Sequence, residues 1–227
     1  MADRPAATPD FTFFESVAAL AAWDACDANP LHISNTPLLT RTTAGPPADG
    51  SSPEKASSTR MLVCHDFKGG YHAYEGPQGI VSAETVYTCE YLQFVDIFVY
   101  FAHKRVAIPP AAWINYMHKN GVKVLGTFIV EGDNGSSELR EIFQPETENT
   151  VYHAGHYANQ LASIAETYGF DGWLLNFESR FPREIFDFPI FSSWLDYLRD
   201  ELHRLVPGSQ LMWYGRHMFF DRIRPSV

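Results

Sequence analysis

The sequence has 227 residues, 45% of them hydrophobic, which is enough to bury a substantial core in one large domain or two small ones. Lys and Arg total 17 against 27 for Asp and Glu. The resulting formal charge of −10 disfavours nucleic acid or an anionic membrane as a partner. Neutral ligands are still possible partners. The sequence gives no indication of the oligomeric state.

The three cysteines, Cys26, Cys64 and Cys89, are widely spaced and form neither a disulfide framework nor a zinc-binding pattern. The N-terminal residues contain neither a secretory signal nor an apolar span of about 20 residues. We therefore expect a reducing compartment, the cytosol, and no bound metal.

The first 59 residues differ in composition from the rest. Residues 1–41 combine an amphipathic stretch, Phe14 to Trp23, with an extended segment, and we expect them to form an arm that packs on the remainder. Residues 42–59 consist of Thr, Ala, Gly, Pro, Ser and charged residues, without a large apolar side chain. Such a segment cannot offset its ordering entropy by burial, so it is predicted to be a flexible loop or linker before a domain at 60–227.

Five short apolar runs follow, and each is typical of a strand buried on both faces. They cover residues 61–67, 95–101, 122–130, 172–178 and 210–215. Three helical patterns lie between them: one from Pro109-Pro110 to Gly121, one from about Tyr157 to Gly169, and one from Ser192 or Ser193 to Pro207. Alternating strands and helices predict a parallel sheet, either as a barrel or as an open doubly wound sheet.

Polar or reactive residues follow several of these strands. They are His65-Asp66, His103-Lys104, Glu131, Asn176, Glu178 and Trp213-Tyr214. The carboxyl ends of the strands form the active-site edge of a (β/α)8 barrel, and no nucleotide-binding glycine motif follows any strand. The sequence therefore favours an α/β fold of the (β/α)8 TIM-barrel type. Residues 61–227 are fewer than the ~250 of such a barrel, so we expect an incomplete barrel of about five βα units.

Asn176 and Glu178 are the most informative pair. Strand residues two apart share one face, and at roughly 3.3 Å per residue their backbones lie about 6 to 7 Å apart. Glycosidases usually need two carboxylates, but a 2-acetamido sugar can supply its own attacking oxygen. An asparagine can then orient the acetamide while a single glutamate donates the proton and activates water.

The segments "HDFKGGY", "VKVLGTFIVEG", "FDGWLLNFE" and "LMWYG", in this order, resemble glycoside hydrolase family 85, the cytosolic endo-β-N-acetylglucosaminidases. The resemblance covers roughly Phe11 to Tyr214 and is most specific from Asp171 to Glu178. It implies Asn176 as the acetamide-orienting residue and Glu178 as the general acid/base. It also implies retaining cleavage between the two core N-acetylglucosamines of free oligosaccharides, glycopeptides or glycoproteins, without metal or cofactor. Lys68 and the residues from Gly215 onward depart from the family pattern.

Five further residues are candidates for substrate contacts. Asp66 and Tyr71 are predicted to contact sugar or to close the first strand, and Glu131 to bind a sugar hydroxyl or line the pocket. The resemblance places Tyr214 near the acetamide, and Trp213 is a candidate for stacking on a sugar, although both also suit a core. We interpret "EGDNGSSELREIF" as solvated surface.

Two alternatives stay open. We expect the chain to be a truncated form of a longer enzyme, with weak or no activity by itself. In the first alternative, the chain is a catalytically inactive carbohydrate-binding fragment of that enzyme. An unrelated open α/β enzyme is favoured if the strand order is doubly wound.

Overall fold

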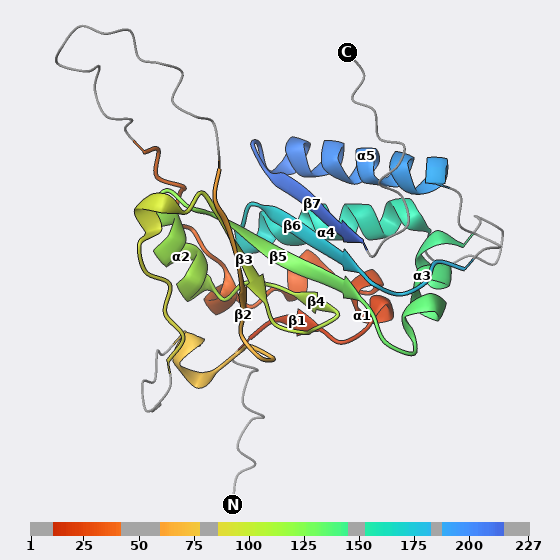
Figure 1. Cartoon of the computed structure of the whole chain (residues 1–227), viewed down its shortest axis with the longest axis horizontal. Coiled ribbons are helices and arrows are strands. Elements are labelled where there is room, and N and C mark those ends of the chain that lie inside the picture. Colours follow the sequence, from red (N-terminus) through yellow and green to blue (C-terminus); the bar gives the residue numbers. More distant parts are fainter. Residues whose placement is uncertain (1–10, 42–59, 78–85, 145–152, 183–187, 216–227) are drawn as a thin grey trace, which may run out of the picture.

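The structure is a computed structural model that describes residues 11–41, 60–77, 86–144, 153–182 and 188–215 (Figure 1). Within these ranges, five parallel strands form one sheet. They are β2 (Leu62–Asp66), β3 (Ile97–Phe101), β5 (Lys123–Val130), β6 (Gly172–Phe177) and β7 (Gln210–Gly215). Each of the five apolar runs is thus a strand, as predicted. The predicted linker at 42–59 lies outside the described residues.

These five strands neighbour one another in the order in which they occur along the chain. A doubly wound sheet reverses its strand order at a switch point, and no such reversal occurs among the described strands. The open doubly wound alternative is therefore wrong for this part of the chain. In the described residues β2 pairs only with β3 and β7 only with β6, and the predicted number of βα units stays a prediction.

In the described part of the chain, five helices accompany the sheet: α1 (Val17–Ala21), α2 (Ala111–Lys119), α3 (Gly135–Phe143), α4 (Ala154–Tyr168) and α5 (Phe188–Leu205). Helices α2 and α4 confirm the predicted patterns, and α4 ends at Gly169 with φ +76° as the sequence indicated. Helix α5 begins at Phe188, so Ser192 and Ser193 lie inside it and are not its N-cap. Short 3₁₀ turns occur at 25–27, 30–32, 73–75 and 92–94.

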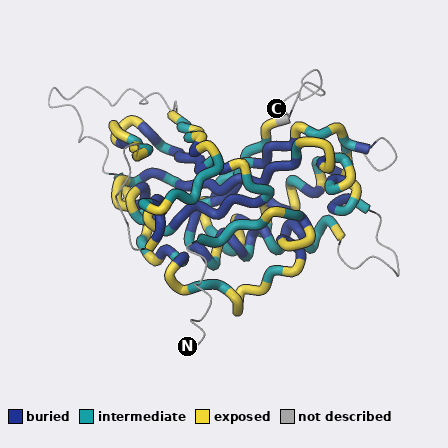
Figure 2. The backbone as a smooth tube through the Cα atoms, turned by 90° about the horizontal axis from the view of Figure 1, so that it is seen from below, coloured by how far each residue is buried: buried dark blue, intermediate teal, exposed yellow. Residues whose placement is uncertain are grey.

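The N-terminal residues 11–41 are part of the same packed structure. Strand β1 (Phe13–Phe14) pairs antiparallel with β4 (Val106–Ala107), which itself pairs antiparallel with β5. Helix α1 is capped by the Ser16 side chain and buries Val17 and Leu20. The apolar face of the arm therefore adds to the main core, which Figure 2 shows as buried backbone through the middle of the molecule.

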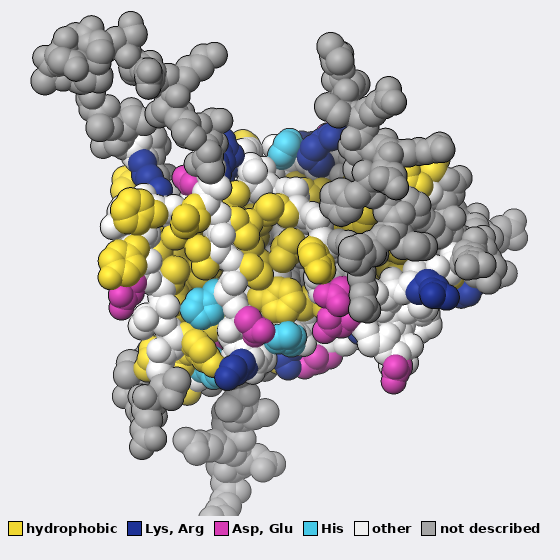
Figure 3. Space-filling view, viewed as in Figure 1, with side chains coloured by type: hydrophobic (Ala, Val, Ile, Leu, Met, Phe, Trp, Pro, Cys, Tyr) yellow, Lys and Arg dark blue, Asp and Glu magenta, His cyan; other side chains and the backbone are white. Residues whose placement is uncertain are grey.

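The two faces of the sheet have different surroundings. Alternate residues of β6, Trp173, Leu175 and Phe177, join the large core to which all five helices contribute. Leu174, on the other face, belongs to a separate cluster of strand residues: Leu62, Ile97, Val99, Leu125, Leu174 and Met212. No described helix contributes to this second cluster. Figure 3 looks onto this face, with hydrophobic side chains over the strands.

Candidate active site

Asp171, the residue just before β6, holds the start of this strand. Its Oδ2 accepts the Val124 amide (2.7 Å) and lies 2.8 Å from Nε2 of His118. The other ring nitrogen of His118 lies 2.7 Å from the Thr36 carbonyl oxygen. Burial lowers the pKa of His118, but the hydrogen bond and charge of Asp171 and the Thr36 carbonyl outweigh burial and raise it above its usual value. Both ring nitrogens of His118 face hydrogen-bond acceptors, so the doubly protonated, positively charged imidazolium fits this site.

Gly172 and Trp173 place β6 between its neighbours. Gly172 has φ +132°, and a Cβ there would lie 1.9 Å from the carbonyl oxygen of Gln210 on β7, so glycine permits this close strand pairing. Trp173 is fully buried and donates its indole N–H to the Leu161 carbonyl of α4 (2.9 Å). The residues of the "DGW" motif thus have structural roles, whereas the candidate catalytic residues Asn176 and Glu178 lie at the other end of β6.

Asn176 and Glu178 meet at the carboxyl end of β6. Asn176 Nδ2 donates to Glu178 Oε1 across 3.3 Å. Asn176 is buried, with 4% exposed, whereas Glu178 is exposed, and the Glu178 amide donates to the Val130 carbonyl (3.0 Å). The expectation that the two side chains share one face is confirmed.

Tyr214 lies beside Asn176. Asn176 pairs in register with Ile129 on β5 and with Tyr214 on β7, and residues in register on parallel strands point to the same face. Tyr214 is 55% exposed, so its ring is free to meet a ligand over this face. The structure therefore brings Tyr214 together with the Asn176 and Glu178 pair.

Glu131 follows the last residue of β5, and its place is set by the strand register. Val130, the last residue of β5, pairs with Phe177, the last residue of β6, so Glu131 and Glu178 are the residues that directly follow this pair. Glu131 is partly exposed. A second carboxylate thus lies at the same edge of the sheet.

Asp66 lies at the same carboxyl edge of the sheet, on β2. Its carboxylate lies 3.1 Å from Nε2 of His103 and accepts the Lys68 amide at 2.7 Å. Partial burial raises the pKa of Asp66, but the Lys68 amide and His103 outweigh it and hold the pKa below its usual value. Figure 3 shows acidic and histidine side chains gathered at this end of the strands.

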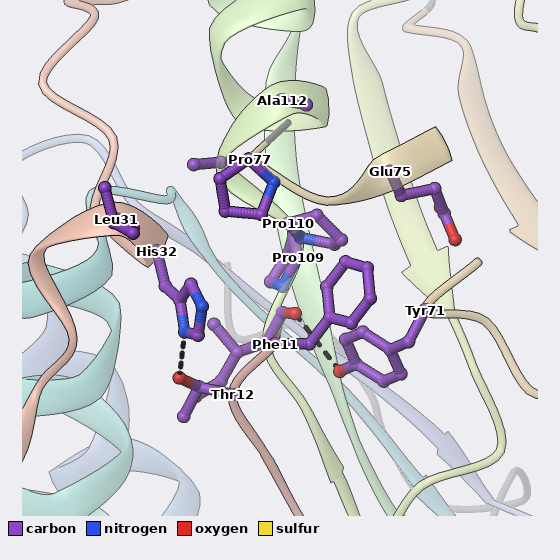
Figure 4. A pocket seen from close by; sticks show the side chains of 12 residues that line it. Phe11, Thr12, Leu31, His32, Tyr71, Glu75, Pro77, Pro109, Pro110 and Ala112 are labelled. Carbon is purple, nitrogen blue, oxygen red and sulfur yellow. Dashed lines mark hydrogen bonds between the residues drawn. The ribbon is translucent and has the colours of Figure 1, made fainter. Parts of the chain in front are cut away.

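Tyr71 is turned away from this edge, toward the arm (Figure 4). Its hydroxyl donates to the Ile108 carbonyl (3.1 Å), and its ring stacks on Phe13 and contacts Phe11. Burial raises the pKa of Tyr71 well above its usual value. The structure therefore supports the structural interpretation of Tyr71 rather than a sugar contact.

Trp213 points to the helix-covered face of the sheet. It packs against the main core, and its ring lies 5.1 Å from that of Phe191 in α5. Its neighbour Tyr214 points to the opposite face because strand side chains alternate. The structure does not bring Trp213 together with Asn176, so its placement fits the core alternative and not the predicted sugar stacking.

Helix α3 was missed by the sequence analysis, which assigned its residues to solvated surface. Leu139, Ile142 and Phe143 are buried. Their spacing of three and four residues is the sign of an amphipathic helix that could have revealed it. Since α3 begins four residues after Glu131, this helix borders the candidate site.

Among the described residues, no group of three or more His, Cys, Asp or Glu side chains is arranged to hold a metal ion. None of the helices in the described ranges has the length and apolar character needed to cross a membrane.

Comparisons with known proteins identify the family of this chain. The model of the family described as glycosyl hydrolase family 85 matches residues 72–219. Cytosolic endo-β-N-acetylglucosaminidase 2 of Arabidopsis thaliana is 41% identical over 155 residues, 68% of this chain and 21% of its own length. Cytosolic endo-β-N-acetylglucosaminidase of Homo sapiens is 37% identical over 213 residues, 93% of this chain and 26% of its own length.

Among solved structures, the glycoside hydrolase domain of Endo-D from Streptococcus pneumoniae R6 is similar with a TM-score of 0.64 and 20% identity. The match covers 91% of this chain and 31% of that one, and it shows a shared fold. This chain spans about a quarter of the length of the curated relatives it matches.

Proposed function

Because this chain belongs to glycosyl hydrolase family 85, we propose that the carboxyl edge of β6 is the catalytic centre of an endo-β-N-acetylglucosaminidase. The substrate is an N-glycan, free or attached to a peptide or protein, and the bond cleaved joins its two core N-acetylglucosamines. The relatives are named cytosolic, and we extend that location to this chain.

The proposed reaction relies on the substrate's own acetamide. Its carbonyl oxygen attacks the anomeric carbon while Glu178 protonates the leaving glycosidic oxygen, which gives an oxazolinium-type intermediate. Glu178, now a carboxylate, takes a proton from water, and the water opens this ring with retention. Asn176 orients the acetamide and stabilises its nitrogen as it becomes electron-poor. The reaction needs no metal or cofactor.

The observation that carries this proposal is the orientation of the Asn176 amide. Its nitrogen is turned to Glu178 Oε1, 3.3 Å away. The amide oxygen is then the atom that accepts the acetamide N–H. A carboxylate at position 176 would repel ionised Glu178, whereas the neutral amide donates to Glu178 and keeps its oxygen for the acetamide N–H.

Tyr214, Glu131 and Asp66 are the proposed substrate contacts, since all three lie at the carboxyl edge of the one parallel sheet, at the ends of β7, β5 and β2. Two register pairs support this: Tyr214 is the β7 partner of Asn176, and Glu131 and Glu178 directly follow the pair Val130 and Phe177. The division into an arm at 1–41, a linker at 42–59 and a partial TIM-barrel domain at 60–227 remains part of this proposal.

One observation favours a second candidate, a carbohydrate-binding fragment without turnover. In the described residues β7 pairs only with β6, so the substrate contacts that described strands supply end at Tyr214. Fewer contacts position the reacting groups less precisely, which lowers catalysis more than binding.

One experiment separates these candidates. The purified chain is incubated with a glycopeptide that carries the N,N′-diacetylchitobiose core, and mass spectrometry records the peptide products. A peptide that keeps one N-acetylglucosamine, formed by the unaltered chain and not by Glu178→Gln, supports the enzyme. Binding of the glycopeptide without this product supports the binding fragment, and neither binding nor product contradicts both.

A further inference from the structure

The start of α3 is in unusually close contact with the residue that follows Glu178. A Cβ built on Gly135 would lie 1.8 Å from Ser179 Oγ and 2.6 Å from Ser179 Cβ. Contacts this short cannot exist, so any larger residue at position 135 must displace the chain at Ser179 or the start of α3. Glu178 is bonded covalently to Ser179, and such a displacement is passed to its backbone.

Two hydrogen bonds hold the same segments together. Ser136 Oγ donates to the Arg180 carbonyl (2.7 Å), and Ser179 Oγ donates to the Gly132 carbonyl (3.4 Å). The β5–α3 connection and the first turn of α3 thus contact both residues that follow Glu178.

Glu178 is held from the strand side as well. The amides of Glu178 and Ser179 both donate to the Val130 carbonyl, at 3.0 and 3.1 Å. The backbone of Glu178 is thus fixed by β5 on one side and, through Ser179, by α3 on the other.

Helix α3 is firmly attached to the rest of the fold. The Arg105 side chain donates to Glu138 of α3 (Nε to Oε1, 3.0 Å) and to the Ile129 carbonyl of β5 (Nη1 to O, 2.6 Å). Leu139 and Ile142 of α3 are fully buried. The helix is therefore a rigid support against which Ser179 rests.

We infer that Gly135 is a positioning residue for Glu178: its lack of a side chain lets α3 close on Ser179, and this contact sets where the Glu178 carboxylate stands relative to Asn176. The inference rests on the proposed function, in which the glutamate must reach the glycosidic oxygen. A misplacement of about 1 Å in a catalytic group can lower a rate by roughly 100-fold, so the contact has kinetic consequences.

A set of four variants of the full chain tests this inference. Gly135→Ala introduces the clash, Ser179→Gly removes both atoms that it would meet, and the double variant combines the two changes. Gly155→Ala is the matched control: Gly155 also lies in the first turn of a helix, α4, and the nearest atom to its Cβ would be the His153 side chain at 3.1 Å.

We expect Gly135→Ala to lower kcat roughly 10- to 100-fold with KM changed by less than about threefold. The double variant should recover most of that loss, to the level of Ser179→Gly, and Gly155→Ala should match the unaltered chain. A Gly135→Ala enzyme as active as Gly155→Ala, or a double variant as slow as Gly135→Ala, would overturn the inference.

A second measurement does not depend on turnover. The glutamate carboxyl groups are labelled with ¹³C, and the NMR signal of Glu178 is identified as the one that is lost in Glu178→Gln. It should move in Gly135→Ala and return toward its original position in the double variant. If the unaltered chain hydrolyses nothing, the proposed function fails, and this signal still decides the positioning: a signal that is the same in all variants contradicts it.

Should Gly135→Ala fail to fold, Ser136→Ala takes its place. It adds no atoms and removes only the hydrogen bond to the Arg180 carbonyl. We then expect a moved Glu178 signal in a folded protein, and an unmoved signal contradicts the inference.

Discussion

The Asn176 side chain donates a hydrogen bond to Glu178 Oε1 at 3.3 Å, and this bond ties the buried member of the pair to the exposed one. Buried Asn176 is held between its register partners on β5 and β7. Glu178, at the strand end, is open to solvent and to a glycosidic oxygen. A buried and fixed Asn176 suits a group that orients the substrate, and an exposed Glu178 suits a proton donor.

Glu178→Gln should lower hydrolysis of the diacetylchitobiose-containing glycopeptide by at least about 100-fold, because a glutamine cannot exchange the proton. Glutamine keeps a hydrogen-bonding side chain of the same length beside Asn176, so glycan binding should be preserved. Product formation and equilibrium binding are measured on the same preparations. Glu166→Gln, an exposed change on α4, is the control. Equal rates for Glu178→Gln and this control would contradict the assignment.

Asn176→Ala should abolish hydrolysis of the glycopeptide but still consume a preformed sugar oxazoline. The alanine cannot orient the acetamide, whereas a preformed oxazoline has already passed the step that needs orientation. Consumption of the oxazoline is followed by chromatography, beside Glu178→Gln. An alanine variant that is inert toward the oxazoline in a folded protein would count against the orienting role.

Trp213 and Tyr214 form a natural pair for comparison, since they are adjacent on β7 and point to opposite faces. Trp213→Ala should lower the free energy of unfolding by roughly 3 kcal/mol, because it empties part of the core beside Phe191. Tyr214→Ala should change it by less than about 1 kcal/mol and weaken glycan binding instead. Denaturant unfolding and glycopeptide titration are the measurements, and the reverse pattern would contradict the two placements.

The His118–Asp171 pair makes stability depend on pH. The pKa of His118 is raised in the folded chain, so folding takes up a proton. The stabilisation is full below the unfolded pKa of about 6.5 and is lost as pH rises through the folded pKa. His118→Gln should lower the free energy of unfolding by roughly 1–3 kcal/mol at low pH, because Asp171 loses its charged partner and keeps only the Val124 amide, and should flatten the pH dependence above pH 6.5.

Denaturant unfolding from pH 5.5 to 8.5 checks this prediction, with His153→Gln as a control at an exposed histidine. A His118→Gln variant that keeps the slope of the unaltered chain would show that another group is responsible.

Much of this architecture could be predicted from local pattern. The five apolar runs are strands, and Asn176 and Glu178 share a face because side chains alternate along any strand. Helix α3 was missed because charged and small residues dominate its sequence, and its three buried side chains fill space only when α3 lies against β5. Likewise, the alternation of side chains along a strand predicts that Trp213 and Tyr214 point to opposite faces of the sheet. It does not predict which of the two faces the helices.

The sequence by itself determined the five parallel strands, helices α2 and α4, the family and the pair of residues at the end of β6, since each depends on neighbours within a few positions of the chain. Only the tertiary structure decided which face is covered by helices, that Tyr71 turns to the arm, and that Gly135 meets Ser179. Those outcomes depend on contacts between different helices, strands and loops of the chain, and packing of whole elements selects among faces that are equivalent in a single strand.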